Sequence, residues 1–343
     1  MRKTLFFLSI LAALVSCSEN QPYQFTVSDI ETHIDTLSSD YFLGRMPFTE
    51  GEEKTVAYLV NEFQKLGLEP GNGDSYIQEV PMVSILTQPS ETMEIQSAKE
   101  KISLNGLQDY VFWTQRTDSA VSFQDAEMVF AGFGIVAPEY GWDDYKNIDV
   151  KDKIVVVLVN DPGFGTEDAS FFKGNTMTYY GRWTYKYEEA IRQGALGCLI
   201  VHNTIPAGYG FNVIQNSWNS SKLYLDDRGK EGYKLAFEGW VTLPTANRLF
   251  EMAGLNEREL LAKARKPDFQ AIPLNLKASS SMKVEATNNT SQNVVAKLTG
   301  EQNPDEYIVY TAHWDHLGVG KPDASGDSIY NGALDNASGT AAL

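Results

Sequence analysis

The stretch YIVYTAHWDHLGVG, residues 307–320, decides the fold of this chain. Its first four residues are aromatic or β-branched, which predicts a short buried strand of a parallel sheet. His313, Asp315 and His316 follow the predicted strand directly. Because the chemistry of open α/β sheets lies just beyond the carboxyl ends of their strands, we expect these side chains to lie at a functional site.

A second polar segment, NGALDNASG, follows at residues 331–339 and places Asp335 among small residues. Imidazole nitrogens and carboxylate oxygens are zinc ligands, and a carboxylate can bridge two metal ions. A ligating His usually donates its other ring N–H to a carboxylate, and Asp315 is a candidate for that role at His313. The alternative is a strand-end His satisfied by a neighbour and an Asp that caps a helix before Ala337. The succession of strand, His-x-Asp, loop and Gly-x-x-Asp-Asn-x-Ser-Gly favours the metal site.

TAHWDHLG followed by NGALDNASG resembles the zinc aminopeptidases of family M28. The resemblance implies that His313 binds one of two zinc ions and that Asp315 orients this His. It implies also that Asp335 bridges both ions and that the peptide bond between Asp335 and Asn336 is cis. His316 matches a position that is often occupied by His in one subgroup, and the resemblance assigns it no ligand role.

The M28 pattern continues beyond the bridging Asp with a Glu-Glu pair, a further carboxylate ligand and a final His. None of these follows Asp335 in this sequence, where a helix is expected over residues 336–343. We therefore expect the chain to be the N-terminal portion of a longer protein that supplies the general base and the remaining ligands. On its own, the chain is expected to bind zinc weakly and to be inactive.

Length and composition predict an ordinary globular protein. The 343 residues suggest about two domains, and the 43% hydrophobic and 12% aromatic content is enough for a core. The formal net charge of −17 argues against nucleic acid as a partner, because phosphates would be repelled. The acidity otherwise fits a solvated surface.

The N-terminus reads MRKTLFFLSILAALVSC, a basic start followed by an apolar run too short to span a bilayer. This pattern is typical of a signal peptide. LVSC at residues 14–17 resembles a bacterial lipobox, which implies lipidation of Cys17 and anchoring to a membrane surface of the cell envelope, periplasmic or outer-membrane. The alternative is an ordinary signal peptide with a chance Cys. The other cysteine, Cys198, lies in an apolar run and is predicted to be a core residue rather than a nucleophile.

Two capping boxes predict early helices, one opening at Ser28 and one at Thr49 with Glu52 three residues later. Two further charged residues, Arg45 and Glu50, could be structural or lie near the site, and the structural role is favoured.

The middle of the chain reads as a strand at 153–159, a helix at 183–191 and a strand at 196–201. Such a unit favours a parallel strand pair. The segments DKIV at 152–155 and AIRQGALGCLIVH at 190–202 resemble a protease-associated domain inserted into the peptidase. Residues 204–240, rich in Asn, Ser, Gly, Tyr and Trp, predict a long surface excursion.

These features predict an α/β fold, a three-layer sandwich of the zinc-exopeptidase type that is incomplete at its C-terminus and carries a β-rich α/β insert. The predicted divisions are a signal peptide at 1–17, a first peptidase part at 18–115, a protease-associated domain at 116–275 and a second peptidase part at 276–343. The resemblance implies a metallo-exopeptidase that removes N-terminal residues from peptides with two zinc ions. A single-zinc acyltransferase of the glutaminyl-cyclase type and a lipid-anchored peptide-binding protein with a vestigial site remain alternatives.

Overall fold

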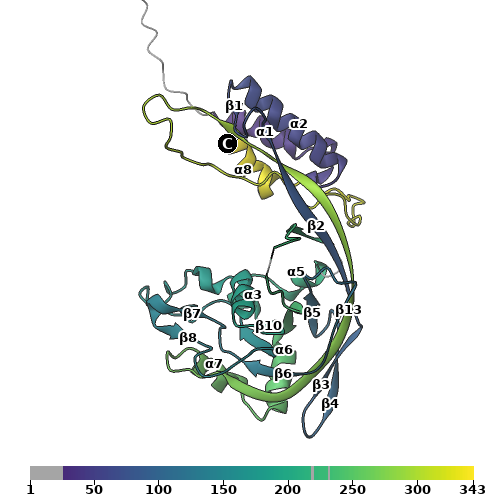
Figure 1. Ribbon diagram of the computed structural model, residues 1–343, viewed down its shortest axis with the longest axis vertical. Helices are drawn as coiled ribbons and strands as arrows, with labels where there is room; N and C mark the ends of the chain where they lie inside the picture. The colour runs from purple at the N-terminus through teal and green to yellow at the C-terminus, as the bar shows by residue number, and fades with distance from the viewer. Residues whose placement is uncertain (1–25, 218–219, 231) are drawn as a thin grey trace, which may run out of the picture. The chain divides into compact units, whose positions relative to one another are not determined.

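The computed structural model describes residues 26–217, 220–230 and 232–343, which form two compact units (Figure 1). The first unit combines the chain up to Gln78 with the segment from Gln292 to Leu343, and the second is Glu79–Ser291. The predicted signal peptide and Cys17 lie outside the described residues. In the described part of the chain, every helix is too short or too polar to cross a bilayer.

Among the described residues, the second unit is organised around a ten-stranded mixed sheet with the order β11-β2-β13-β6-β9-β10-β12-β5, and β3 and β4 extend it beside β13. Figure 1 shows the long strand β13 running beside β2. The strands are β2 (Ile77–Pro89), β3 (Thr92–Gln96), β4 (Lys101–Asn105), β5 (Tyr110–Trp113), β6 (Ala120–Phe130), β9 (Ile154–Leu158), β10 (Gly197–His202), β11 (Lys222–Leu225), β12 (Phe237–Thr242) and β13 (Ile272–Val294).

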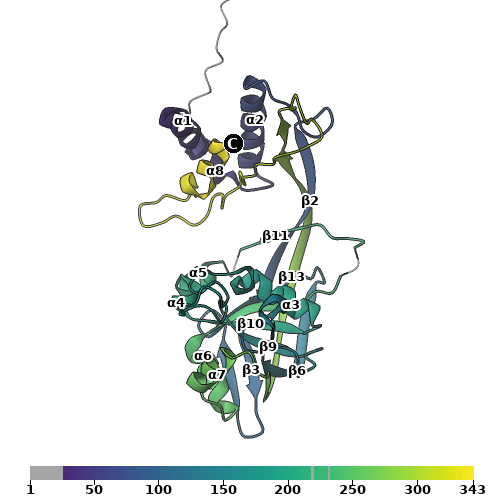
Figure 2. The same cartoon turned by 90° about the vertical axis from the view of Figure 1, so that its left-hand side faces the viewer.

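The predicted β-α-β unit is confirmed in the middle of this sheet. Strands β9 and β10 are parallel and are joined through helix α3 (Trp183–Arg192). Four more α-helices lie in the described part of this unit, and Figure 2 shows α4, α5, α6 and α7 to one side of the strands. They are α4 (Thr204–Ala207), α5 (Phe211–Asn216), α6 (Leu243–Met252) and α7 (Glu257–Ala264). The α/β class is thereby confirmed.

The prediction that residues 204–240 form a surface excursion is wrong for the last residues of that range, from Phe237 onward. Strand β12 begins at Phe237 and pairs in parallel with β10, and its side chains are buried. The strand is short and follows a polar segment, so its pattern was masked by its neighbours. Phe237 and Trp240 nevertheless bury large aromatic surfaces, which strongly favours the strand in three dimensions.

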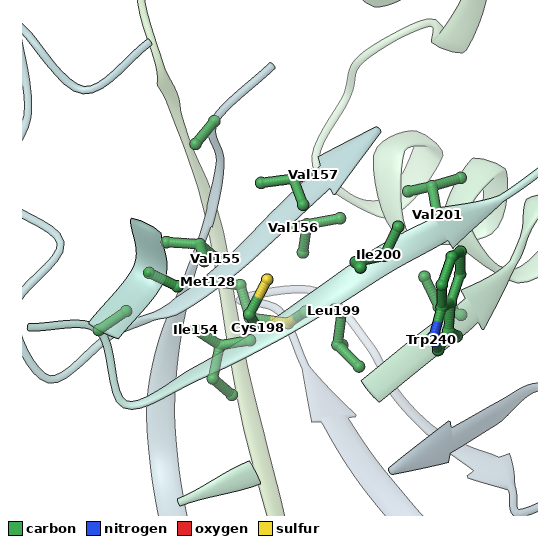
Figure 3. Close-up of a cluster of buried hydrophobic side chains, with 14 of the residues drawn as sticks. Met128, Ile154, Val155, Val156, Val157, Cys198, Leu199, Ile200, Val201 and Trp240 are labelled. Atoms are coloured by element: carbon green, nitrogen blue, oxygen red, sulfur yellow. The ribbon is translucent and has the colours of Figure 1, made fainter. Parts of the chain in front are cut away.

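The core of the second unit packs around the central parallel strands (Figure 3). Val155, Val156, Leu199 and Ile200 are fully buried, as expected for strands covered on both faces. Cys198 lies among them, and burial raises the pKa of its thiol far above the ordinary value. The prediction that Cys198 is a core residue is confirmed.

The second unit extends beyond the insert predicted at 116–275. Its sheet includes β5, which pairs antiparallel with β12, and β2, which pairs antiparallel with β11. The strands assigned to the first peptidase part therefore belong largely to the second unit. Alternating sequence predicts that these strands exist but not which strands they pair with, so the compact unit and the predicted insert have different limits.

The first unit contains three α-helices in its described residues, α1 (Val27–Leu37), α2 (Glu50–Lys65) and α8 (Ser338–Ala342). Thr26, not Ser28, caps α1, and its hydroxyl accepts a hydrogen bond from the Asp29 N–H at 3.2 Å. Thr49 caps α2 as predicted. The Glu52 carboxylate accepts hydrogen bonds from the N–H of Phe48 and, at 3.0 Å, from that of Gln292.

The predicted strand at 307–310 does not form. Tyr307 is 77% exposed and Ile308 is 84% exposed, and no described strand pairs with this segment. A β-strand is stabilised by hydrogen bonds to a neighbour, so an apolar pattern alone does not produce one. The first unit's described sheet is the two-stranded pair of β1 (Glu69–Pro70) and β14 (Ala296–Lys297), and the large mixed sheet lies in the second unit.

Replacement of Leu199 by Ala should destabilise the second unit by about 2–5 kcal/mol, because it removes a fully buried side chain and leaves a cavity. Urea unfolding followed by tryptophan fluorescence measures this, since five of the six tryptophans fall between Glu79 and Ser291 in the sequence. The control, Leu225→Ala, alters a side chain that is 66% exposed and should change stability by less than about 1 kcal/mol. Equal effects of the two variants would contradict this core.

Glu238 should make the second unit less stable as the pH rises. The buried carboxylate accepts hydrogen bonds from Trp113 Nε1 at 3.1 Å and Gln115 Nε2 at 2.6 Å, and burial raises its pKa to about 7. A raised folded-state pKa gives stability that is complete below the ordinary value of about 4.3 and is lost as the pH rises to about 7.

Glu238→Gln should therefore flatten the decline in unfolding free energy between about pH 4.3 and 7. The measurement is urea unfolding at pH 5 and pH 7.5. The exposed Glu100→Gln should leave the decline as it is in the wild type. An unchanged decline in Glu238→Gln would show that this carboxylate does not titrate in that range.

Candidate metal site

Two loops of the first unit bring the predicted site residues together. One loop carries His313, Asp315 and His316, and the other carries Asp335 in a turn over Ala333–Ala337 that leads into α8. The peptide bond between Asp335 and Asn336 is cis, as the M28 resemblance implied. Residues more than twenty positions apart thus share one site.

The His313 ring lies between two acidic residues. Its Nε2 atom is 3.2 Å from Oδ1 of Asp335. Its Nδ1 atom is 3.0 Å from the backbone carbonyl oxygen of Asp315 and 3.5 Å from that residue's Oδ1. When Nδ1 carries the proton and donates it to Asp315, the lone pair of Nε2 faces the Asp335 carboxylate.

His316 lies on the other side of the same carboxylate. Its Nδ1 atom is 3.9 Å from Oδ2 of Asp335. Burial lowers the pKa of His316, and the negative charge of Asp335 opposes this effect. The side chains of His313 and Asp335 are 54% and 70% exposed, whereas that of His316 is 15% exposed. The donor atoms of His313 and Asp335 are therefore open to an incoming ion.

Arg45 holds the two loops against the N-terminal segment. Its side chain is fully buried, and burial lowers its pKa while the charges of Asp315 and Asp335 oppose the shift. All of its hydrogen bonds go to backbone carbonyl oxygens of both site loops and of the end of α1. They run from Nε to Trp314 at 2.8 Å, from Nη1 to Asn331 at 2.6 Å and to Leu37, and from Nη2 to Gly332 at 2.8 Å.

Glycines at two positions permit this close approach. Gly332 has a φ of +62°, and a Cβ atom there would lie 2.6 Å from Arg45 Nη2 and from His316 Cδ2. Gly44 has a φ of +65°, and a Cβ atom there would lie 2.4 Å from the carbonyl oxygen of Gly318. A side chain at either position would separate the loops, and left-handed backbone favours glycine in any case.

Further hydrogen bonds fix the backbone around His313. Its carbonyl oxygen accepts from Thr340 Oγ1 at 3.1 Å and from Asn336 Nδ2 at 3.4 Å. The neighbouring Trp314 donates its Nε1 proton to the carbonyl oxygen of Gln292 at 3.0 Å. The position of His313 is thus set by α8 on one side and by the end of β13 on the other.

The donor set fits zinc in kind, because imidazole nitrogen and carboxylate oxygen are its ordinary protein ligands. It is incomplete in number. No group of three or more His, Cys, Asp or Glu side chains within the described ranges is arranged to hold a metal ion. His313 and Asp335 would hold an ion only together with donors beyond these.

The role of Arg45 was only partly predictable from sequence. The sequence favours a structural role for Arg45 over a position near the site. Its buried contacts agree with the first, and its hydrogen bonds to both site loops show that it also lies near the site. Glu50 lies at the exposed start of α2 and forms an ion pair with Lys54 at 2.8 Å. A signal for Arg45 was available, since it is a lone charge in the segment YFLGRMPF at 41–48.

The candidate site is a His-x-Asp loop that faces an Asp-Asn turn. Residues 293–343, which carry it, match the family model of peptidase family M28. The segment that carries the site is thus similar to this family, and the resemblance is confirmed there. No curated protein matches the sequence.

Among solved structures, the chain is similar to BSAP, a zinc aminopeptidase from Bacillus subtilis, with 17% sequence identity and a TM-score of 0.35. The similarity covers 94% of this chain and 56% of that structure. The chain therefore spans little more than half the length of the aminopeptidase.

Arg45→Lys should loosen both site loops, because an ammonium group cannot reproduce the planar set of guanidinium hydrogen bonds. The loss of about two charge-assisted bonds should destabilise the first unit by about 2–4 kcal/mol. Hydrogen exchange of the amides at 312–318 and 331–337 should accelerate. Arg228→Lys is the control, since that side chain is 70% exposed, and it should leave these amides unchanged. If these amides still exchanged slowly in Arg45→Lys, Arg45 would not be the residue that holds the two loops in place.

Proposed function

We propose that this protein is a zinc-dependent aminopeptidase with a two-metal site. The observation that carries the proposal is the position of the His313 ring, with Nε2 toward Asp335 and Nδ1 toward Asp315, in the segment that matches family M28. Peptides are the substrate class of that family. The activity, substrate and ion number of the whole protein are part of the proposal, because the chain spans 56% of the aminopeptidase structure to which it is similar.

In this proposal His313 and Asp335 hold metal, and Asp335 is the shared carboxylate. When bound, zinc ions would polarise the scissile carbonyl group and lower the pKa of a bound water molecule. Asp315 would keep the proton on Nδ1 of His313, so that Nε2 stays available as a ligand. The proposed site would need further ligands and a general base besides His313 and Asp335.

Arg45 is a positioning residue in this scheme. It binds the carbonyl oxygens of Trp314 and Gly332 and so fixes the spacing of the two loops from behind. Its positive charge lies close enough to Asp315 and Asp335 to interact with both carboxylates.

We further propose that the protein is exported and anchored to a membrane surface through lipidated Cys17, and that its second unit is a protease-associated insert. The lipobox-like LVSC at 14–17 supports the first proposal. The β-α-β unit built from β9, α3 and β10 supports the second. Mass spectrometry of the mature N-terminus tests the anchor, and an unmodified Cys17 in the exported protein would exclude it.

The metal site is tested with the complete protein by release of amino acids from aminoacyl anilides, with and without a chelator. Activity should require metal and be lost in His313→Ala. Asp315→Asn should weaken zinc binding by about tenfold, at the lower end of the range for such partners, because its backbone carbonyl still holds Nδ1. Zinc affinity is measured by titration calorimetry.

His33→Ala is the matched control, since it removes an imidazole from α1 of the same unit and should leave zinc affinity unchanged. Chelator-resistant activity would contradict the metal mechanism. A folded complete protein that binds no zinc and releases no amino acid would instead indicate a peptide-binding protein with a vestigial site.

A further inference from the structure

The second unit contains an aromatic pocket that the metal site does not explain. Its volume is about 520 Å³, within the range of roughly 300–1,000 Å³ for small-molecule sites. Its walls come from the ends of β5, β11 and β12 and from helices α3 and α5. The aromatic residues that line it are Trp113, Trp183, Tyr187, Tyr209, Tyr224 and Trp240.

Lys222 and Glu238 line this pocket, and they carry opposite charges above about pH 7, where the Glu238 carboxyl group with its raised pKa is ionised. Glu238 is 4% exposed, and its carboxylate accepts hydrogen bonds only from the neutral groups of Trp113 and Gln115. Lys222 is partly buried, and its Nζ atom lies 4.5 Å from the centre of the Trp113 ring. Among the described residues, its one hydrogen bond is a long 3.4 Å contact to the Ser217 carbonyl oxygen. In the described part of the chain, neither group forms an ion pair.

A buried charge without a counter-ion in contact is costly. The charges of Lys222 and Glu238 line the same cavity and attract each other, but no salt bridge joins them in the described part of the chain. A ligand with an ammonium and a carboxylate group would supply a partner of opposite charge to Glu238 and to Lys222. Aromatic faces also attract ammonium groups and pack against apolar side chains. Glu188, half-buried at the pocket, adds a second acidic group that favours a ligand ammonium.

We propose that this pocket binds a small zwitterion with an apolar side chain, a free amino acid or a dipeptide. Its ammonium group would lie against Glu238 and its carboxylate against Lys222. A neutral sugar could pack against the aromatic walls but would form an ion pair with neither Lys222 nor Glu238. The inference goes beyond the proposed peptidase site, although its ligand is of the class that an aminopeptidase releases, and every residue that lines the pocket belongs to the second unit.

The first test is calorimetric titration of the intact chain with L-phenylalanine and with alanylphenylalanine, in buffer containing a chelator. Phenylethylamine lacks the carboxylate and 3-phenylpropionate lacks the ammonium. Each should bind at least about tenfold more weakly than the zwitterion, because each forfeits one charge-assisted contact. Comparison of phenylalanine with the dipeptide distinguishes a free amino acid from a peptide terminus.

The second test uses Lys222→Met and Glu238→Gln, which remove one charge each and keep the side-chain size. Each should weaken zwitterion binding by about tenfold or more. The matched controls are Lys99→Met and Glu100→Gln, at exposed positions between β3 and β4, and they should bind like the wild type. Circular dichroism checks folding. If Glu238→Gln fails to fold, the comparison of zwitterion with single-charge analogues decides alone.

Absence of binding by phenylalanine and the dipeptide would overturn the proposal. Equal binding of phenylethylamine and phenylalanine would overturn the role of Lys222. Binding of cellobiose that persists in Lys222→Met would show a glycan site instead. Because a chelator is present throughout, these outcomes are independent of whether the metal site functions.

Discussion

The site depends on one buried guanidinium group. Arg45 follows Leu43 and Gly44, and all three have left-handed backbone, which is costly for the two residues that carry a Cβ. The hydrogen bonds from Arg45 to four backbone carbonyl oxygens offset this cost. Only a planar group with donors on several sides can reach carbonyls from the end of α1 and from both site loops together. The N-terminal segment therefore determines how Asp335 faces His313.

The two sequence segments of the first unit contact each other directly, although the second unit separates them in sequence. The chain leaves the first unit near Gln78 and returns near Gln292. These two points are joined directly, since Asn293 Nδ2 donates to Gln78 Oε1 at 2.9 Å and the Val295 N–H donates to the Tyr76 carbonyl oxygen at 2.7 Å. Glu52 adds a bond to Gln292 from the start of α2. The two ends of the second unit's segment are therefore held together by residues of the first unit.

Local signals were predictable from sequence, and features that need a distant partner were not. The Thr49 cap and the β9-α3-β10 unit follow from patterns within about fifty residues, and both are confirmed. The strand predicted at 307–310 failed because no described neighbour pairs with it. The pairing of His313 with Asp335 came from a family resemblance, not from periodicity. The Arg45 contacts escaped prediction because backbone carbonyls carry no residue-specific signal.

In the described residues, the backbone of the site loops is held in place while the potential metal-ligand atoms stay exposed. Behind the site, Arg45 and the Thr340 bond to the His313 carbonyl leave the loops little freedom. In front, the Nε2 of His313 and the carboxylate of Asp335 remain open. A preformed backbone with exposed donors lowers the ordering cost of binding an ion, so affinity depends mainly on how many further donors approach. The two placed donors orient an ion but do not suffice to hold it tightly.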